Sequence, residues 1–327
     1  MKAKNSVLNE GDFLKALQRA TEHKRGEYLA CYSSWLGGYV TDPAFMVLPL
    51  DDHMVHRGDG VFEALRMENY KLLAWAEHWQ RLQRSAASIG LKLLWSEEDL
   101  ITHLRKLVEL CGRSEGFIRI FVSRGPGSFS VNPYEVSGPE LHIVVTALKQ
   151  PPSELYKRGL KLGPSRWPQK PEPFFKIKSC NYLPNVLMKK EAVDLGLDLT
   201  LSFTEDGRLA EGPTENVALV TKEGDFLTPQ LDSVLEGTTL AKVMELAGQL
   251  VSQGSLKSVQ FCDLRAQDLK RASEVLVIGT TWGVIGATSW EGEALGGGRP
   301  GPIAETLQQR LKDLQGDLRH TLDLRCS

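Results

Sequence analysis

Segments with strand and helix patterns follow one another without a regular order in this chain of 327 residues. Residues 61–67, 117–123 and 141–147 are rich in β-branched and aromatic side chains, which is typical of strands. Residues 79–89 and 96–111 carry apolar side chains at helical spacing. A doubly wound parallel sheet needs a strict alternation of strands and helices, so this order does not favour it. The sequence therefore predicts an α+β fold.

The chain from residue 150 onward has the same mixture, and Pro151-Pro152 marks the clearest linker. We expect a helical arm over residues 1–26, a small α/β domain over 27–149 and a larger, barrel-like domain over 150–327. Further strands are expected near residues 28–32, 44–49, 159–163, 198–203, 216–220, 226–228 and 274–279. Further helices are expected over residues 11–24, 184–195, 239–250 and 302–315.

Composition excludes several classes of partner. The net charge of −2 and the pI of about 6.4 argue against a nucleic-acid groove or an anionic membrane surface as the main partner. No run of about 18 apolar residues and no signal-peptide pattern is present, so we expect a cytoplasmic protein. His53 and His56 have no Cys or further His nearby, so no metal site is expected. The five cysteines form no CxxC pair and are expected to be reduced thiols: Cys31, Cys111, Cys180, Cys262 and Cys326.

The segment over residues 174–185, FFKIKSCNYLPN, carries the most informative lysine. Lys178 follows an apolar–polar alternation and precedes a polar turn and a helix pattern, so we place it at the end of a strand. An isolated lysine there is most often an exposed strand side chain. In a pocket, desolvation would lower the pKa of Lys178, and its free amine could then attack an aldehyde to form a Schiff base.

Further motifs follow Lys178 in a fixed order. Their order favours a Schiff-base lysine over an exposed strand lysine. They are Tyr182, the sequence RLAEGPTENVALV, and the sequence DSVLEGTTLAKVMELA. Together they make the chain, from about Asp51 to about Leu311, resemble the class IV aminotransferases. That family includes branched-chain aminotransferases, D-amino-acid aminotransferases and aminodeoxychorismate lyases. The resemblance implies a two-domain, fold-type IV enzyme that uses pyridoxal 5′-phosphate and forms homodimers.

The resemblance also implies roles for individual residues. Lys178 would form the Schiff base with pyridoxal phosphate and move the substrate proton. Glu211 would pair with the pyridine nitrogen, which keeps the ring an electron sink, and Tyr182 would lie near the phenolic oxygen. Taken alone, Glu211 is better explained as a turn carboxylate before Gly212. The implied phosphate-binding residues are Arg81, Thr238, Thr239 and Thr280, of which Thr238 and Thr239 lie at the start of a predicted helix whose N–H groups suit an anion.

Substrate recognition is less sharply defined. The D-amino-acid branch has an Arg-x-His carboxylate clamp, and this chain has Ser123-Arg124-Gly125 with no such His. Arg57 and Arg124 could each grip a carboxylate, although an isolated arginine is more often a surface or structural residue. The other candidates for contact with substrate are Phe62, Thr281 and Trp282, of which Trp282 could narrow a pocket or belong to the core. We expect transamination between an amino acid, with a branched-chain-like one favoured, and a 2-oxo acid. The alternatives are a lyase that releases pyruvate from aminodeoxychorismate, a D-amino-acid aminotransferase, or a non-catalytic ligand-binding homologue.

Overall fold

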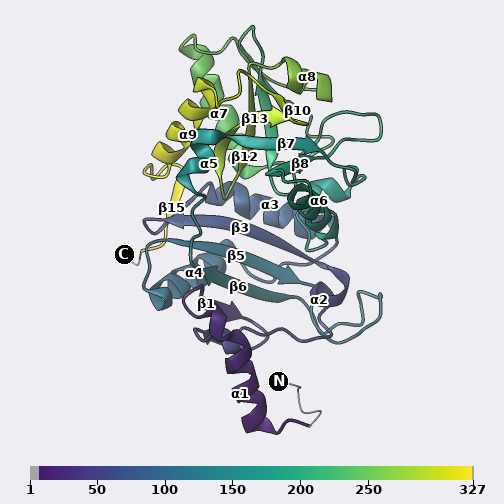
Figure 1. Cartoon of the computed structure of the whole chain (residues 1–327). Coiled ribbons are helices and arrows are strands. Elements are labelled where there is room, and N and C mark those ends of the chain that lie inside the picture. The colour runs from purple at the N-terminus through teal and green to yellow at the C-terminus, as the bar shows by residue number, and fades with distance from the viewer. Residues whose placement is uncertain (1–6, 326–327) are drawn as a thin grey trace. The chain divides into compact units, whose positions relative to one another are not determined.

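The computed structural model describes residues 7–325, which divide into two compact units (Figure 1). Unit 1 comprises the described residues up to Tyr70, the segment Leu91–Leu148 and the chain from Leu324 to the end of the described part. Unit 2 comprises Lys71–Gly90 and Lys149–Asp323. Residues 71–90 therefore pack with unit 2, although they precede the linker expected near residue 150.

Unit 1 is built on an antiparallel sheet with the strand order β3-β5-β6-β1-β2. In β3 every second side chain is buried, the pattern of a strand with one face toward a core. Helix α4 packs on β1 and β6. Its first turn is closed by a reciprocal capping box between Ser96 and Asp99, and Gly112 ends it in the left-handed conformation, as the sequence predicts. The elements of unit 1 are α1 (Glu10–Thr21), η1 (Glu22–Lys24), β1 (Tyr28–Ser33), β2 (Gly38–Val40), η2 (Pro43–Phe45), α2 (His53–Arg57), β3 (Gly60–Glu68), α4 (Glu97–Cys111), β5 (Gly116–Ser123) and β6 (Glu140–Thr146).

Unit 2 contains a mixed sheet with the strand order β11-β10-β9-β12-β13-β7-β8, and the short β14 pairs with β13. In the other sheet, whose full strand order is β15-β4-β3-β5-β6-β1-β2, β4 pairs with β15 in the antiparallel sense. The strands of unit 2 are β4 (Lys71–Leu73), β7 (Leu160–Pro164), β8 (Leu199–Leu201), β9 (Asn216–Val220), β10 (Asp225–Pro229), β11 (Ser258–Cys262), β12 (Glu274–Gly279), β13 (Gly283–Trp290), β14 (Glu293–Ala294) and β15 (Thr321–Asp323). Its helical elements are α3 (Trp75–Ser88), α5 (Ser153–Arg158), η3 (Phe174–Lys176), α6 (Leu183–Asp194), α7 (Thr238–Ser252), α8 (Ala266–Arg271) and α9 (Pro302–Leu314).

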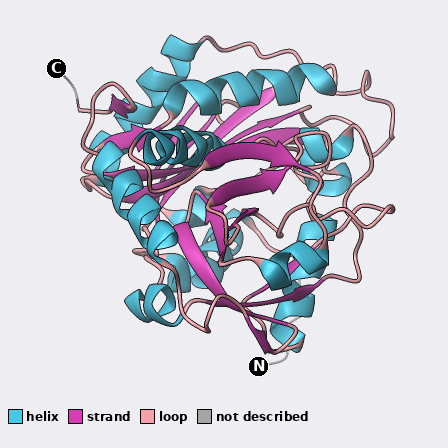
Figure 2. Cartoon of the chain, turned by 90° about the horizontal axis from the view of Figure 1, so that it is seen from above, coloured by secondary structure: helices cyan, strands magenta, loops and turns pink. Residues whose placement is uncertain are grey.

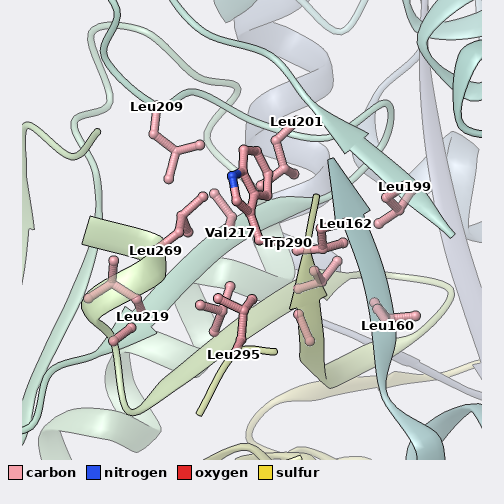
Figure 3. Close-up of a cluster of buried hydrophobic side chains, with 14 of the residues drawn as sticks. Leu160, Leu162, Leu199, Leu201, Leu209, Val217, Leu219, Leu269, Trp290 and Leu295 are labelled. Atoms are coloured by element: carbon pink, nitrogen blue, oxygen red, sulfur yellow. The ribbon is translucent and has the colours of Figure 1, made fainter. Parts of the chain in front are cut away.

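Both faces of the unit 2 sheet are buried, which explains why its strands are apolar runs. Along β12, Val275 and Val277 point into one core, and Leu276 and Ile278 point into the other. The second core is completed by α7 and α9, which contact each other. The first core surrounds the fully buried Trp290, as Figure 3 shows. The start of α7 is thereby fixed against the sheet, and this position matters for the pocket described below.

Helices and strands both contribute throughout the described chain (Figure 2), so the predicted α+β class is confirmed. The strand expected over residues 44–49 is wrong. Residues 43–45 form the 3₁₀ turn η2 and the chain then continues without pairing, because Pro43 and Pro49 lack the N–H groups that a strand ladder needs. The exposed Val47 and Leu48 produced the misleading apolar pattern.

Four of the cysteines are free thiols in the structure, and Cys326 lies outside the described residues, as does the start of the predicted arm. None of the helices formed by residues 7–325 has the length and apolar character required to cross a membrane. Over the same residues, no group of three or more His, Cys, Asp or Glu side chains could hold a metal ion.

We expect Trp290→Ala to lower the free energy of unfolding by about 3–5 kcal/mol, because it removes a large side chain from a closed core. The measurement is the midpoint of chemical unfolding followed by a probe in unit 2. Trp35→Ala is the matched control, since Trp35 is 43% exposed and should be nearly neutral. Equal losses for the two variants would contradict this account of the core.

Candidate active site

Lys178 is held in a short extended segment between a 3₁₀ turn and a helix. It follows η3 and the buried Ile177, and α6 begins at Leu183. The backbone N–H of Lys178 donates to Ser85 Oγ at 3.1 Å. The strand predicted before Lys178 is therefore wrong, since Pro171 and Pro173 interrupt the backbone N–H pattern and turn the chain into η3. The prediction that the lysine enters a pocket does not depend on that strand.

The side chain of Lys178 lines a pocket that lies within unit 2. Its walls come from α3, from the start of α6, from the loop before β9, from the start of α7 and from the end of β12. The pocket brings together every residue that the sequence predicted to hold a cofactor, namely Arg81, Lys178, Tyr182, Glu211, Thr238, Thr239 and Thr280. These residues are dispersed along the chain, so their convergence is independent of the sequence motifs.

Three polar side chains share one buried face of α3. His78, Arg81 and Ser85 follow the helical spacing of three and four residues. Each has a partner in the second part of unit 2: His78 Nε2 lies 3.0 Å from Thr238 Oγ1, and Arg81 Nη1 donates to the Glu236 carbonyl at 2.9 Å. Buried polar groups are costly without such partners. The helix is therefore tied to the pocket by hydrogen bonds at three points along its length.

The carboxylate of Glu211 is buried and accepts two hydrogen bonds. Gln169 Nε2 donates to its Oε1 at 2.8 Å, and the backbone N–H of Leu235 donates to its Oε2 at 3.0 Å. Burial raises the pKa of Glu211, while the Gln169 hydrogen bond and the charge of Lys170 oppose that rise. The same Gln169 amide also donates to the Ser233 carbonyl at 2.7 Å. The carboxylate is thus fixed in orientation by two segments of the chain.

A second buried carboxylate, that of Glu215, lies in the same wall. It accepts a hydrogen bond from the backbone N–H of Thr214 at 2.9 Å and another from the Thr214 hydroxyl. Burial raises the pKa of Glu215, and these hydrogen bonds oppose the rise. Asn185, on the buried face of α6, donates to the Pro213 carbonyl, and its buried Oδ1 has no partner in the structure. The loop 212–215 is therefore held from both sides.

The start of α7 forms an anion-binding wall. Its first N–H groups have no helical acceptor, and Thr238, Thr239 and Thr280 add hydroxyls there. Thr239 Oγ1 lies 3.5 Å from Thr280 Oγ1. The guanidinium of Arg81 adds a positive charge to this wall. Backbone donors, hydroxyls and one guanidinium form a donor set suited to a phosphate group.

Gly237, just before α7, is required by close packing. A Cβ atom at this position would lie 1.9 Å from Asn216 Oδ1. The Asn216 amide cannot swing away freely, because its Nδ2 donates to the Leu235 carbonyl at 3.0 Å. This glycine therefore lets the N-terminus of α7 approach the loop that carries Glu211, and the resulting cradle fits a phosphorylated, aromatic cofactor.

Sequence reasoning missed several residues of the pocket. Lys170 lies in a segment rich in proline and lysine and gave no signal. Gln169, which donates to the pocket residue Glu211, belongs to no motif and gave none either. Asn185 could have been found, because it falls on the buried face of the helix predicted over residues 184–195. Glu215 lies inside the recognised RLAEGPTEN sequence, where Glu215-Asn216 resembles the branched-chain branch, but nothing in the sequence indicated that its side chain is buried.

Three of the candidate substrate residues lie in unit 1. Arg124 donates from Nε and Nη2 to Asp59 at 3.0 and 2.9 Å, so the edge of the guanidinium that would grip a carboxylate is already occupied. Arg57 is exposed, and its Nη2 donates to the Phe129 carbonyl at 2.7 Å. Phe62 stacks with Phe121 on the neighbouring strand, with ring centroids 5.9 Å apart.

Thr281 and Trp282 lie in unit 2, directly after the pocket residue Thr280, but they are not among the residues that line the pocket. The Thr281 side chain is exposed. Trp282 packs against the core around Trp290, and its carbonyl accepts a hydrogen bond from the Tyr156 hydroxyl at 2.8 Å. Its position is consistent with the alternative that Trp282 is a core residue.

The motifs gathered in this pocket have counterparts in known proteins. Residues 60–290 match the family described as "Amino-transferase class IV". The chain belongs to this family. Class IV aminotransferases use pyridoxal 5′-phosphate, and the donors of the pocket fit that cofactor.

Three relatives illustrate the range of this aminotransferase family. The D-amino-acid transaminase, chloroplastic, of Arabidopsis thaliana is 39% identical over 282 residues, which cover 86% of this chain and 75% of the relative. The D-alanine aminotransferase of Bacillus licheniformis is 28% identical, over 84% of this chain and 94% of the relative. A putative branched-chain-amino-acid aminotransferase of Methanocaldococcus jannaschii is 27% identical, over 86% of this chain and 96% of the relative.

Solved structures of two branched-chain aminotransferases share the fold. That of Thermoproteus uzoniensis, determined with norvaline, has a TM-score of 0.80 and 22% identity and covers 91% of this chain and 99% of its own. That of Escherichia coli has a TM-score of 0.81 and 22% identity and covers 92% of this chain and 100% of its own. At this identity the likeness establishes the fold, and the predicted fold-type IV architecture is confirmed.

We expect Gly237→Ala to weaken the binding of pyridoxal phosphate at least about tenfold, because its methyl group would push the start of α7 away from Asn216. The measurement is titration of the apoprotein with the cofactor, followed by absorbance. Gly248→Ala is the matched control in the same helix, since nothing lies within 4 Å of its added Cβ, and it should stabilise the helix by about 1 kcal/mol. Similar cofactor affinity in the two variants would refute the proposed cradle.

Proposed function

We propose that the pocket of unit 2 binds pyridoxal phosphate and that this aminotransferase moves an amino group between an amino acid and a 2-oxo acid. The observation that carries the proposal is the convergence of Lys178, Glu211 and Arg81 at the start of α7. A primary amine, a buried carboxylate and an anion-binding wall are the three features that the cofactor requires at its aldehyde, ring nitrogen and phosphate. A non-catalytic homologue would have no need to retain all three in one pocket.

Each proposed role follows from a contact of the protein. Glu211 would face the ring nitrogen, because it is a buried carboxylate whose oxygens are held in position by hydrogen bonds from Gln169 and from the backbone of Leu235. Arg81, Thr238, Thr239, Thr280 and the first N–H groups of α7 would hold the phosphate. Tyr182 would contact the phenolic oxygen, and its ring lies 5.9 Å from Lys178 Nζ. These roles extend the sequence predictions without altering them.

The proton transfer is assigned to Lys178. When bound, pyridoxal phosphate withdraws electrons from the substrate Cα and makes its proton acidic. Lys178 Nζ would take that proton from Cα and deliver it to C4′ of the cofactor, and it would reverse the transfer with the incoming 2-oxo acid. Because Lys178 is only 9% exposed, bulk water has little access to the proton during this exchange.

The amino donor that we propose first is a D-amino acid. This choice is supported by the Arabidopsis and Bacillus relatives, whose names specify D-amino acids. A branched-chain amino acid, which the sequence favoured, is the second candidate. It is supported by the Methanocaldococcus relative and by the Glu215-Asn216 pair, which resembles the branched-chain branch. The homodimer and the cytoplasmic location stay predictions.

Lys178→Ala should reduce turnover by roughly 10²- to 10⁴-fold, the range lost when a positioned acid–base group is removed. Steady-state formation of the 2-oxo acid is the measurement. Lys176→Ala is the matched control, because Lys176 is two residues away and its side chain is 47% exposed. A Lys178→Ala variant with the turnover of the control would overturn the assignment.

The donor class can be tested on the holoenzyme by adding one amino acid at a time without an acceptor. We expect D-alanine to bleach the visible absorbance of the bound cofactor and to release a stoichiometric amount of pyruvate. Bleaching by L-leucine alone would replace the first candidate with the second. Release of pyruvate from aminodeoxychorismate over many turnovers, with no amino acceptor, would identify a lyase instead.

A further inference from the structure

The pocket contains a second lysine to which neither the family motifs nor the proposed reaction gives a role. Lys170 lies on the loop before η3, it is half-buried, and it lines the same pocket as Lys178. Its Nζ lies 5.5 Å from the ring centroid of Tyr182, within the range of a cation–π contact. Because Lys178 Nζ approaches the same ring, the two amines border one region of the pocket.

Lys170 has no anionic partner at ion-pair distance among residues 7–325. Burial lowers the pKa of Lys170, and the charge of the more distant Glu211 only partly opposes this effect. A half-buried ammonium group without a close anion is unfavourable, so the pocket gains free energy when an anion enters beside it. The side chain is thus prepared for a ligand that carries negative charge.

The other charged groups of the pocket already have partners or assigned ligands. The oxygens of Glu211 accept hydrogen bonds from Gln169 and Leu235, and those of Glu215 accept from Thr214. Under the proposed function, Glu211 would also balance the ring nitrogen, and the wall at α7 would take the phosphate. Among these charged groups of the pocket, Lys170 is the cation to which no negative charge has been assigned.

We propose that Lys170 binds a carboxylate of the amino-acid and 2-oxo-acid substrates. The inference rests on the proposed function, since it supplies that reaction with a substrate anchor. It also accounts for two observations on candidate anchors. The chain has no His two residues after Arg124, and the Arg124 guanidinium is paired with Asp59. The Tyr182 ring would hold the flexible lysine stem in place for this contact.

The test uses Lys170→Met, which keeps the length of the side chain and removes its charge, and Lys170→Arg, which restores a charge. In Lys170→Met the KM for amino acid and oxo acid should rise roughly 10- to 100-fold, the cost of one charge-assisted hydrogen bond. Cofactor affinity and kcat should change by less than about threefold. The inhibition constant of propionate, a carboxylate without an amine, should rise in the same proportion, and Lys170→Arg should recover most of the loss.

A substrate without a carboxylate separates anchoring from other effects. In the half-reaction with alaninol, whose alcohol replaces the acid, wild type and Lys170→Met should react equally. Lys176→Met, outside the pocket, is the control for loss of a lysine charge. If Lys170→Met does not fold, Lys170→Gln gives the same comparison with a smaller, polar side chain.

Two results would overturn the proposal. One is an unchanged KM together with a weakened cofactor or a shifted pH dependence of its visible absorbance, which would mean that Lys170 only balances Glu211. The other is an equal loss of rate with the amino acid and with alaninol, which would mean a structural role. Failure of the proposed function is distinguishable, because wild-type protein would then take up no cofactor or would not be bleached by any amino acid.

Discussion

The burial of the Glu211 carboxylate is the constraint on which the pocket depends. A buried charge must be met by donors, and here the donors come from Gln169 and from the backbone of Leu235. Gln169 also reaches the Ser233 carbonyl, so one amide joins the loop before η3, the loop before β9 and the loop before α7. The three walls of the pocket therefore hold one another in place, and a change in one wall alters the position of the carboxylate.

This arrangement needs a rigid support, which the unit 2 sheet provides. Alternate residues of β9 and β12 enter two separate cores, and α7 packs along one of them through Leu240, Val243 and Leu246. Because α7 is anchored along its length, its first N–H groups have a defined position without any side-chain charge. The hydrophobic core thus determines where an anion can bind.

The sequence predicted the fold class and the residues that line the pocket because both depend on local patterns and ordered motifs. Lys178, Glu211 and Arg81 each stand in a recognisable sequence context. The sequence-based prediction was wrong over residues 44–49, where a run of apolar residues alone suggested a strand. It was also wrong just before Lys178, where prolines prevent the expected strand. Lys170 could not be predicted either, because its importance lies in what surrounds it in space, and a lysine among prolines looks like a surface residue.

The position of α3 in the chain has a consequence for the biosynthesis of the enzyme. Residues 71–90 are made early, but His78, Arg81 and Ser85 find their partners only in unit 2, which resumes at Lys149. A ribosome must therefore make the chain beyond Thr238 before the polar face of α3 can be covered. The pocket is accordingly one of the later parts of the protein to form, and a nascent chain cut short before α7 leaves His78 and Arg81 without these partners.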